Sequence, residues 1–259
     1  MKTKLFTILK ILFLATGLGC VASVVWAGYH YLHTDPRFNL RKVTLSELKR
    51  VEDNDILSRI QLKPGSNTNI FAVDMDDVRA RVEQIEWVHH ATVQRVLPDQ
   101  IVIKVVEREP TGLARIDGRI FEFDGEAAIL EPDNSPLPPF PILVELSEND
   151  SESSRETNAR KIAMYQKVVA ELGPDGISQI QVNQNFEVSI VSKEDPLIVK
   201  LGTADFKERW GRYLALKPMI NANYKDALRV DLRFRNKVIL NLHDDDGGKV
   251  IWDGKKKSL

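Results

Sequence analysis

The sequence has 259 residues, of which 43% are hydrophobic and 28% are charged, and its formal net charge at pH 7 is −1. Such a composition provides apolar side chains for one large folded domain or two small ones, and the near-neutral charge gives no electrostatic argument for nucleic-acid binding. The single cysteine, Cys20, excludes an internal disulfide framework and a cysteine-rich metal site.

A long apolar run begins close to the N-terminus. Residues 1–10 include three lysines, and residues 11–32 contain no Asp, Glu, Lys or Arg. A run of about 20 apolar residues is long enough to cross the hydrocarbon core of a membrane as a helix. Because the lysines precede the run, the positive-inside rule predicts a cytoplasmic tail at 1–10, a transmembrane helix at 11–32 and export of everything that follows.

A cleaved signal peptide is the alternative for the same run. The apolar core of a signal peptide is only about 7–15 residues long and leads to small residues at the cleavage site, whereas Trp26 and Tyr29 occupy that region here. A lipoprotein cut before Cys20 is disfavoured, because Gly17 stands where an aliphatic residue is required. Each of these alternatives exports the rest of the chain.

Residues 33–108 mix patterns that are typical of strands and of helices. The predicted elements are strands at 38–45, 87–96 and 100–108 and helices at 53–60 and from Asp74 onward. Asp74 can cap the second helix, since an aspartate side chain accepts hydrogen bonds from the first N–H groups of a helix. The order strand, helix, helix, strand, strand predicts a small α+β module, with three strands covered on one face by two helices.

Residues 109–243 predict a second, β-rich domain with two helices, which makes the whole chain α+β. Turn signals at Asp117-Gly118 and Asp124-Gly125 predict a meander of short strands. The other predicted elements are helices at 158–172 and 205–222 and strands at 177–183, 186–191, 197–201 and 230–242. The polar run 147–157 predicts a surface loop, and the charged residues 244–259 predict a disordered tail.

The last predicted strand alternates clearly. The residues on one of its faces are Val230, Leu232, Phe234, Val238, Leu240 and Leu242, and only Asn236 breaks this pattern. A strand at the end of a domain can lie at a sheet edge, where its unpaired backbone groups can accept a strand from a partner protein. The alternative is that a neighbouring strand of the same chain covers it.

Motifs that carry chemistry are missing from the sequence. No phosphate-binding glycine loop, nucleophile elbow or HExxH zinc motif occurs. Asp74, Asp76 and Asp77 resemble the start of a calcium loop, but the central glycine and the final glutamate are missing. His89 and His90 are adjacent in a predicted strand, so their side chains point to opposite faces and cannot readily bind one metal ion. We therefore expect no enzyme activity, no catalytic, cofactor-binding or metal site, and no small-molecule substrate.

Several short motifs follow one another along the chain. They are Asn69-Ile70-Phe71 before the second predicted helix, Trp87-Val88 with Ala91, Val93 and Arg95, Glu107-Arg108-Glu109-Pro110, Leu201-Gly202 with Arg209, and Val230-Asp231-Leu232-Arg233-Phe234. Together with the basic N-terminus and the apolar run, this order resembles the FtsQ/DivIB family of bacterial cell-division proteins over nearly the whole chain. Phe234 departs from the family pattern, which has a tyrosine there.

The resemblance implies that residues 33–108 form a POTRA domain and residues 109–243 the β domain of an essential, non-enzymatic divisome scaffold. It implies a single-pass protein of the bacterial cytoplasmic (inner) membrane, with its N-terminus in the cytoplasm and its activity at the division septum. The implied partners are FtsB-like and FtsL-like division proteins and other divisome components. Through them the protein would link early and late division proteins and help to control septal peptidoglycan synthesis.

The resemblance also implies where a partner binds, because in relatives the last strand takes the FtsB-like partner by strand addition. The implied partner-binding residues are Arg233, Phe234, Arg235, Asn236, Lys237, Val238, Ile239, Leu240, Asn241 and Leu242. One alternative is a POTRA-containing secretion or outer-membrane assembly component that handles unfolded clients, which would carry several such modules and a membrane barrel. Another is a secreted hydrolase with a scattered site, which activity on cell-wall or peptide substrates would reveal.

Overall fold

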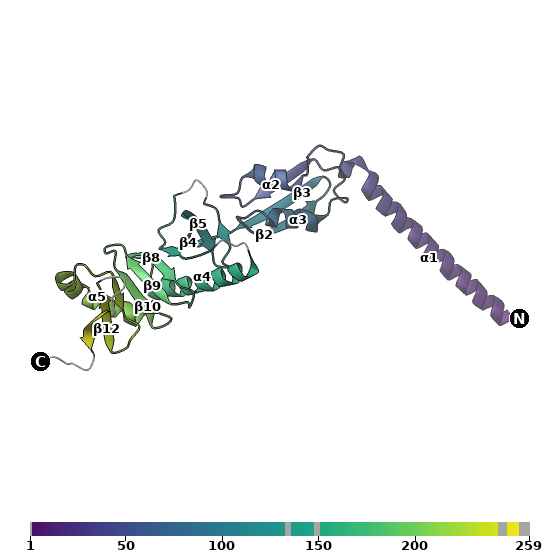
Figure 1. The fold of residues 1–259 in the computed structure, drawn as a ribbon. Helices are drawn as coiled ribbons and strands as arrows, with labels where there is room; N and C mark the ends of the chain where they lie inside the picture. Colours follow the sequence, from purple (N-terminus) through teal and green to yellow (C-terminus); the bar gives the residue numbers. More distant parts are fainter. Residues whose placement is uncertain (1, 133–135, 148–150, 243–247, 254–259) are drawn as a thin grey trace. The chain divides into compact units, whose positions relative to one another are not determined.

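The computed structural model describes residues 2–132, 136–147, 151–242 and 248–253 (Figure 1). The chain divides into two compact units, Met1–Arg108 and Glu109–Leu259, and each has its own hydrophobic core. The elements follow one another largely in the expected order. The predicted α+β class, with an apolar N-terminal helix, a β-α-α-β-β module and a β-rich domain, is therefore confirmed.

Helix α1 spans Lys2–Thr34 and contains the apolar run. Its Phe13–Thr34 portion is long and apolar enough to cross a membrane, and it is not buried against the rest of the protein. Large side chains such as Phe13 and Leu14 are 83% and 75% exposed. Because so much apolar surface is unfavourable in water, α1 is consistent with a single-pass membrane protein.

The rest of the first unit is a three-stranded sheet with two helices. The strand order is β1-β3-β2, with β1 parallel and β2 antiparallel to β3. The elements are the 3-10 helix η1 Pro36–Phe38, β1 Lys42–Ser46, α2 Asp53–Ile60, α3 Met75–Glu83, β2 Val88–Val96 and β3 Gln100–Glu107. Helices α2 and α3 contact each other and enclose a core with the sheet. Fully buried members of this core are Leu40, Ile56, Ile70, Val82, Ala91, Ile101 and Ile103.

The predicted strand at 38–45 is wrong over its first half. The side chain of Asp35 accepts a hydrogen bond from the Arg37 N–H group (2.9 Å) and so caps the 3-10 helix Pro36–Phe38. This turn contains Phe38, Asn39 forms an isolated bridge with Asn69, and β1 begins only at Lys42. Side-chain capping competes with sheet formation in this way wherever an Asp precedes a short turn. By contrast, Asp74 caps α3 as predicted, accepting hydrogen bonds at its Oδ1.

Glu107, the last residue of β3, closes the loop that leads to α2. Its Oε1 accepts hydrogen bonds from the N–H groups of Lys49 (2.8 Å), Arg50 (2.9 Å) and Val51 (3.0 Å). Burial raises the pKa of the Glu107 carboxyl, but these three hydrogen bonds lower it by more, so the pKa lies below the ordinary value of 4.5. The carboxylate therefore holds the backbone of this turn through three consecutive N–H groups.

The second unit contains a sheet of ten strands in the order β13-β12-β11-β10-β9-β8-β7-β4-β5-β6. The strands are β4 Pro110–Ile116, β5 Arg119–Asp124, β6 Ile129–Leu130, β7 Ile142–Val144, β8 Ile177–Val182, β9 Val188–Ser192, β10 Ile198–Gly202, β11 Arg229–Asp231, β12 Lys237–Asn241 and β13 Lys249–Asp253. Helices α4 (Glu152–Leu172) and α5 (Phe206–Asn223) contact each other and pack against β8 and β10 (Figure 1). The largest side chains of the core are Phe123, Tyr165, Phe206 and Tyr213.

Helix α4 begins earlier than predicted, so the surface loop expected at 147–157 is wrong from residue 152 onward. Ser151 is the N-cap, and its side chain accepts a hydrogen bond from the Ser154 N–H group (3.1 Å). The first turns of the helix are mostly exposed to solvent. Their polar composition reflects an exposed helix surface, which composition alone does not separate from a loop.

The long strand predicted at 230–242 is wrong, because the chain turns in the middle of it. Strands β11 and β12 form an antiparallel hairpin, with Arg235 and Asn236 in the turn between them. In this register even-numbered residues face even-numbered residues, as in the pair Val230 and Leu240. The alternation therefore keeps its phase through the turn, and a hairpin of this kind cannot be distinguished from one continuous strand by its period.

The prediction of a disordered tail is wrong for Lys249–Asp253, which forms strand β13. This strand pairs antiparallel with β12, joining for example Leu240 to Lys249 and Ile239 to Val250. The flanking acidic and lysine-rich stretches dominate the composition of this region and hide a strand of only five residues. The rest of the predicted tail, 244–247 and 254–259, lies outside the described residues.

Candidate partner-binding edge

The residues that the sequence singled out for partner binding lie near one end of the large sheet. Arg233, Phe234, Arg235 and Asn236 form the connection between β11 and β12. The next five predicted residues, Lys237, Val238, Ile239, Leu240 and Asn241, are strand β12 itself, and Leu242 follows it. The structure thus brings the ten residues together as a turn and a strand.

Strand β12 is not at the edge of the sheet, so the expectation that the last predicted strand would lie there is wrong. It has β11 on one side and β13 on the other. The alternative stated from the sequence, that a neighbouring strand covers it, holds because Lys249–Asp253 pair with β12. The edge of the sheet at this end is β13.

Strand β12 is anchored in the sheet by its side chains. Val238 and Leu240 are fully buried in the core of the second unit, whereas Lys237 is exposed. Ile239 lies against Gly248, whose φ is +74° and where an added Cβ would collide with the Ile239 side chain. Glycine is therefore required where the chain enters β13, both for its conformation and for this close approach.

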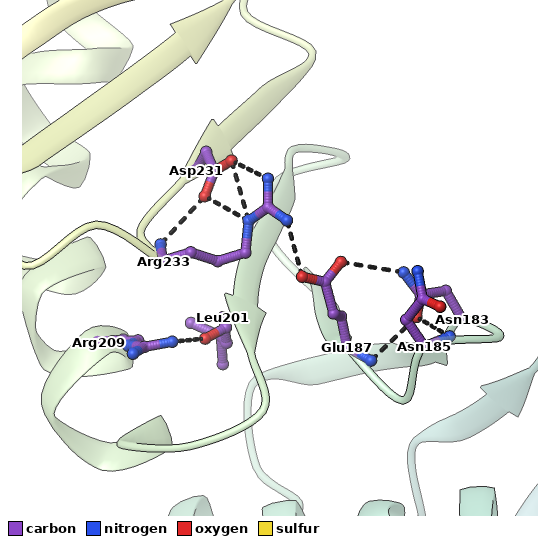
Figure 2. A network of polar contacts seen from close by, with 7 residues as sticks. All are labelled: Asn183, Asn185, Glu187, Leu201, Arg209, Asp231 and Arg233. Carbon is purple, nitrogen blue, oxygen red and sulfur yellow. Dashed lines mark hydrogen bonds and ion pairs between the residues drawn. The ribbon is translucent and has the colours of Figure 1, made fainter.

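Figure 2 shows a network of polar contacts that holds the start of the β11–β12 turn. The Asp231 carboxylate accepts hydrogen bonds from Arg233 N–H (3.0 Å), Nε (3.0 Å) and Nη2 (2.7 Å). Arg233 Nη1 reaches across to Glu187 Oε1 at 2.8 Å. Asn183 completes the network, donating to Glu187 Oε2 (3.2 Å) and accepting from the N–H groups of Asn185 and Glu187 (2.9 Å each). The turn after β11 is thereby tied to the turn between β8 and β9.

The charges in this network stabilise one another. The Arg233 guanidinium, followed by the Asn183 amide, holds the pKa of the Glu187 carboxyl below its ordinary value of 4.5. The same contacts, first with Asp231 and then with Glu187, raise the pKa of Arg233. Asp231 is only 7% exposed, so its negative charge requires the guanidinium beside it.

A second motif meets the network at Gly202. This residue has φ +77°, and an added Cβ would lie 2.8 Å from Arg209 Nη1 and 3.1 Å from Arg233 Cγ. Arg209, on α5, donates a hydrogen bond to the Leu201 carbonyl oxygen. The two sequence motifs, Leu201-Gly202 with Arg209 and Asp231-Leu232-Arg233, are therefore neighbours in space, although about 30 residues separate them in the chain. In this structure the two motifs contact each other at this end of the large sheet.

Two family models match the chain. They are described as POTRA domain, FtsQ-type, over residues 38–108, and cell division protein FtsQ/DivIB, C-terminal, over residues 112–233. The cell division protein FtsQ of Koribacter versatilis is 30% identical over 247 residues, which cover 90% of this chain and 70% of that protein. The chain belongs to the FtsQ/DivIB family of cell division proteins. The resemblance inferred from the motifs is confirmed.

Further relatives carry the same description. The cell division protein FtsQ of Syntrophotalea carbinolica is 23% identical over 247 residues, covering 92% of this chain and 84% of that protein. Among solved structures, the major extracytoplasmic domain of the cell division protein DivIB from Geobacillus stearothermophilus is 14% identical, covers 46% of this chain and 98% of that chain, and has a TM-score of 0.31.

The FtsQ/DivIB C-terminal model stops at Arg233, so nine of the ten predicted binding residues lie beyond it. Phe234, the first of these, stands where the family pattern has a tyrosine, and its side chain is 47% exposed. Its carbonyl oxygen accepts a hydrogen bond from Arg212 Nη1 (3.0 Å), which comes from α5. The backbone of the turn is thus held from the helix side while the ring of Phe234 faces solvent.

The histidines that drew attention in the sequence take part in no metal site among the residues that the structure describes, where no group of three His, Cys, Asp or Glu side chains could hold an ion. His90 Nδ1 lies 2.8 Å from Glu83 Oε1, at the end of α3. This FtsQ-type POTRA unit therefore uses His90 in an exposed polar contact between strand and helix.

Sequence reasoning missed two residues of the site, Glu187 and Asn183. Both lie between β8 and β9, at facing ends of the strands predicted at 177–183 and 186–191, and they belong to no recognised motif. Their partner Arg233 is 46 residues away from Glu187, so no local signal could identify the pair. The signal for Arg233 itself was present, because it belongs to the motif that also holds Asp231.

Proposed function

We propose that this FtsQ/DivIB-family chain is a non-enzymatic scaffold of the bacterial divisome. Helix α1 anchors it in the cytoplasmic (inner) membrane as a single span, with the N-terminus in the cytoplasm and the β-α-α-β-β module and the second unit outside it. Three observations support this: the family match to both units, the exposed apolar surface of α1, and the lysines that precede the apolar run. At the septum it links early and late division proteins and helps to control peptidoglycan synthesis.

The scaffold binds FtsB-like and FtsL-like division proteins, and the β11–β12 end of the large sheet receives a strand of the FtsB-like partner. The observation that carries this proposal is the form of the sheet, which is open and has two ends. One end is β6, with only two residues, so it offers little backbone for pairing. The other end is formed by five-residue strands beside the exposed ring of Phe234, and a longer edge is the better template for strand addition.

Depletion of the protein in its host tests the scaffold role, and co-purification tests the partners. We expect filamentous cells after depletion, and we expect the full chain, extracted in detergent, to co-purify with an FtsB-like and an FtsL-like protein. Normal division after complete depletion, in a host without a second copy, would contradict the role at the septum. Filamentation without either partner in the purified complex would contradict the partner assignment while leaving the role in division intact.

A further inference from the structure

Strand β13 occupies the position that an added partner strand would take beside β12. It runs antiparallel to β12 over Lys249–Asp253, with a bulge at Ile251 between the paired residues. Only seven residues, from Leu242 to Gly248, connect the two strands. The chain therefore supplies a strand of its own to the edge that the proposed function assigns to a partner.

The two strands are held very differently. Val238 and Leu240 of β12 are fully buried, so β12 cannot leave without opening the core. In β13, Lys249 is exposed, Val250 is 49% exposed, and Ile251 is only partly buried against the core. None of the three β13 residues whose burial is described, Lys249, Val250 and Ile251, is fully buried. An element with few buried apolar contacts is the one expected to open first.

We propose that β13 is an intramolecular stand-in for the partner strand, which covers the β12 edge when the partner is absent and is displaced when the partner adds. This inference rests on the proposed function. Covering the edge has a clear physical benefit, because an open strand edge is a template for pairing between copies of the same chain. The cover is replaceable because none of its described side chains, at positions 249–251, is fully buried.

The short connection between β12 and β13 determines how strongly β13 competes with a partner strand for the edge of β12. A strand on a short tether is presented to its neighbour at an effective concentration on the order of millimolar. A partner strand from another protein must overcome this local concentration, and its apparent affinity falls in proportion to the small fraction of molecules whose edge is open. The partner must therefore carry further contacts outside the strand, or be held beside the sheet by its own membrane anchor.

Strand β13 also indicates the chemistry of the strand that replaces it. Ile251 packs against the core, so an apolar side chain is expected at that position of the partner. Lys249 Nζ lies 5.1 Å from the centre of the Tyr224 ring, so a basic residue suits the position beside Tyr224. Val250, which is half-exposed, sets no such requirement. The partner strand is thus antiparallel to β12, with an apolar residue two positions after a basic one.

The exchange is tested with a dye-labelled synthetic peptide that has the sequence of residues 247–254. It is added to the full chain in detergent, to a chain that ends after Leu242 and to a chain that ends after Asp253. We expect the chain without β13 to bind the peptide at least about tenfold more tightly than the other two, because only there is the β12 edge open. The chain that ends after Asp253 keeps β13 and serves as the matched control.

A pair of substitutions repeats the test without truncation. Ile251→Asp places a charge against the core and should release β13, so that the full chain binds the peptide as the truncated chain does. Val250→Asp adds the same charge at the exposed neighbouring position. This variant should bind the peptide as weakly as the full-length wild-type chain does. If Ile251→Asp and the folded truncated chain both fail to bind the peptide, β12 accepts no added strand and the inference is wrong. Equal binding to all the chains, including the one that lacks β13, would show that the peptide binds at a site other than the β12 edge, which also overturns the inference.

A purified FtsB-like protein from the same host separates this inference from the proposed function. The inference expects this partner to bind more tightly after removal of β13 and to be displaced by the peptide. If the peptide results hold but the partner binds no form of the chain, the partner assignment is at fault and the exchange of strands stands. If the partner binds the full chain and is lost on removal of β13, the assignment stands and the stand-in role is wrong.

Discussion

Arg233 and Glu187, 46 residues apart in the sequence, are joined by an ion pair of 2.8 Å between Nη1 and Oε1. The same guanidinium lies 2.7 Å from Asp231 Oδ2, so one arginine serves two carboxylates (Figure 2). The pair connects the turn between β8 and β9 to the start of the β11–β12 turn. One side chain therefore joins the two turns at this end of the sheet.

Replacing Arg233 with Met should destabilise the second unit while keeping the apolar stem of the side chain. The Asp231 carboxylate, which is 7% exposed, would lose its charged donor. We expect the free energy of unfolding to fall by about 2–3 kcal/mol, the range for removal of a charge-assisted contact from a mostly buried group. Urea denaturation of the full chain in detergent, followed by circular dichroism, measures the change.

The control for this experiment is Arg235→Met, which alters an exposed residue in the adjacent turn. Exposed substitutions of this kind change the free energy of unfolding by no more than about 0.5 kcal/mol. If the two variants lose stability equally, the network around Arg233 does not hold the turn, and its charges are a surface feature.

Gly202→Ala should be destabilising for two reasons, the backbone conformation at this position and a steric clash. Neither reason depends on helix or strand propensity. The residue has φ +77°, and the new Cβ would lie 2.8 Å from Arg209 Nη1. We expect a loss of about 1–3 kcal/mol in the free energy of unfolding. Gly211→Ala is the matched control, since Gly211 lies within α5 and a Cβ there meets nothing within 4 Å. That variant should gain about 0.5–1 kcal/mol, and a loss in both would contradict the argument.

Glu107→Gln should weaken the first unit in a pH-dependent manner. Because the pKa of the folded carboxyl lies below its ordinary value of 4.5, ionised Glu107 contributes stability that is fully present above that value. This stability is lost as the pH falls through the lower pKa of the folded state. We expect the variant to be less stable than wild type by about 1–2 kcal/mol at pH 7. The difference should shrink as the pH falls below 4.5.

Thermal denaturation between pH 3 and pH 7, followed by circular dichroism, measures this dependence. Glu109→Gln serves as the control, because it removes a nearby charge of the same kind, and its midpoint should follow that of wild type. A constant difference between Glu107→Gln and wild type across this pH range would show that the carboxylate does not hold the loop through its charge.

The first unit could be predicted from the sequence because its signals are local. The alternation at 87–96 and 100–108 and the cap at Asp74 each specify an element without reference to distant residues. The error at 38–45 is also local, since Asp35 stabilises a turn that alternation does not reveal. What the sequence could not supply was the role of Glu107, whose hydrogen-bond donors lie 56 or more residues away.

The candidate site could be predicted only in part. The motif around Arg233 lies near one end of the sheet, as the predicted site does, but the period-two pattern passed unchanged through the turn at Arg235 and Asn236. The existence of β13 was hidden for a different reason, because the acidic and lysine-rich stretches on either side of it dominate the composition of that region. A sequence pattern shows which side of a strand is apolar, and it does not show which strand lies beside it.

Phe234 provides the sharpest test of the proposed interface. The residue is 47% exposed and is not among the described residues that pack against the core, so Phe234→Ala should leave the free energy of unfolding within about 0.5 kcal/mol of wild type. An aromatic side chain beside a paired strand is a typical anchor of a protein interface, so we expect the dissociation constant for the FtsB-like protein to rise by about tenfold or more.

Two further variants make that result specific. Phe234→Tyr restores the residue of the family pattern and keeps the ring, so it should bind the partner at least as tightly as wild type. Leu214→Ala removes a side chain of similar exposure (49%) on α5, and it should leave binding unchanged. Calorimetric titration of the purified FtsB-like protein into each full-length chain measures all three. If Phe234→Ala binds as Leu214→Ala does, the turn after β11 lies outside the interface, and strand addition must be sought along β12 and β13 alone.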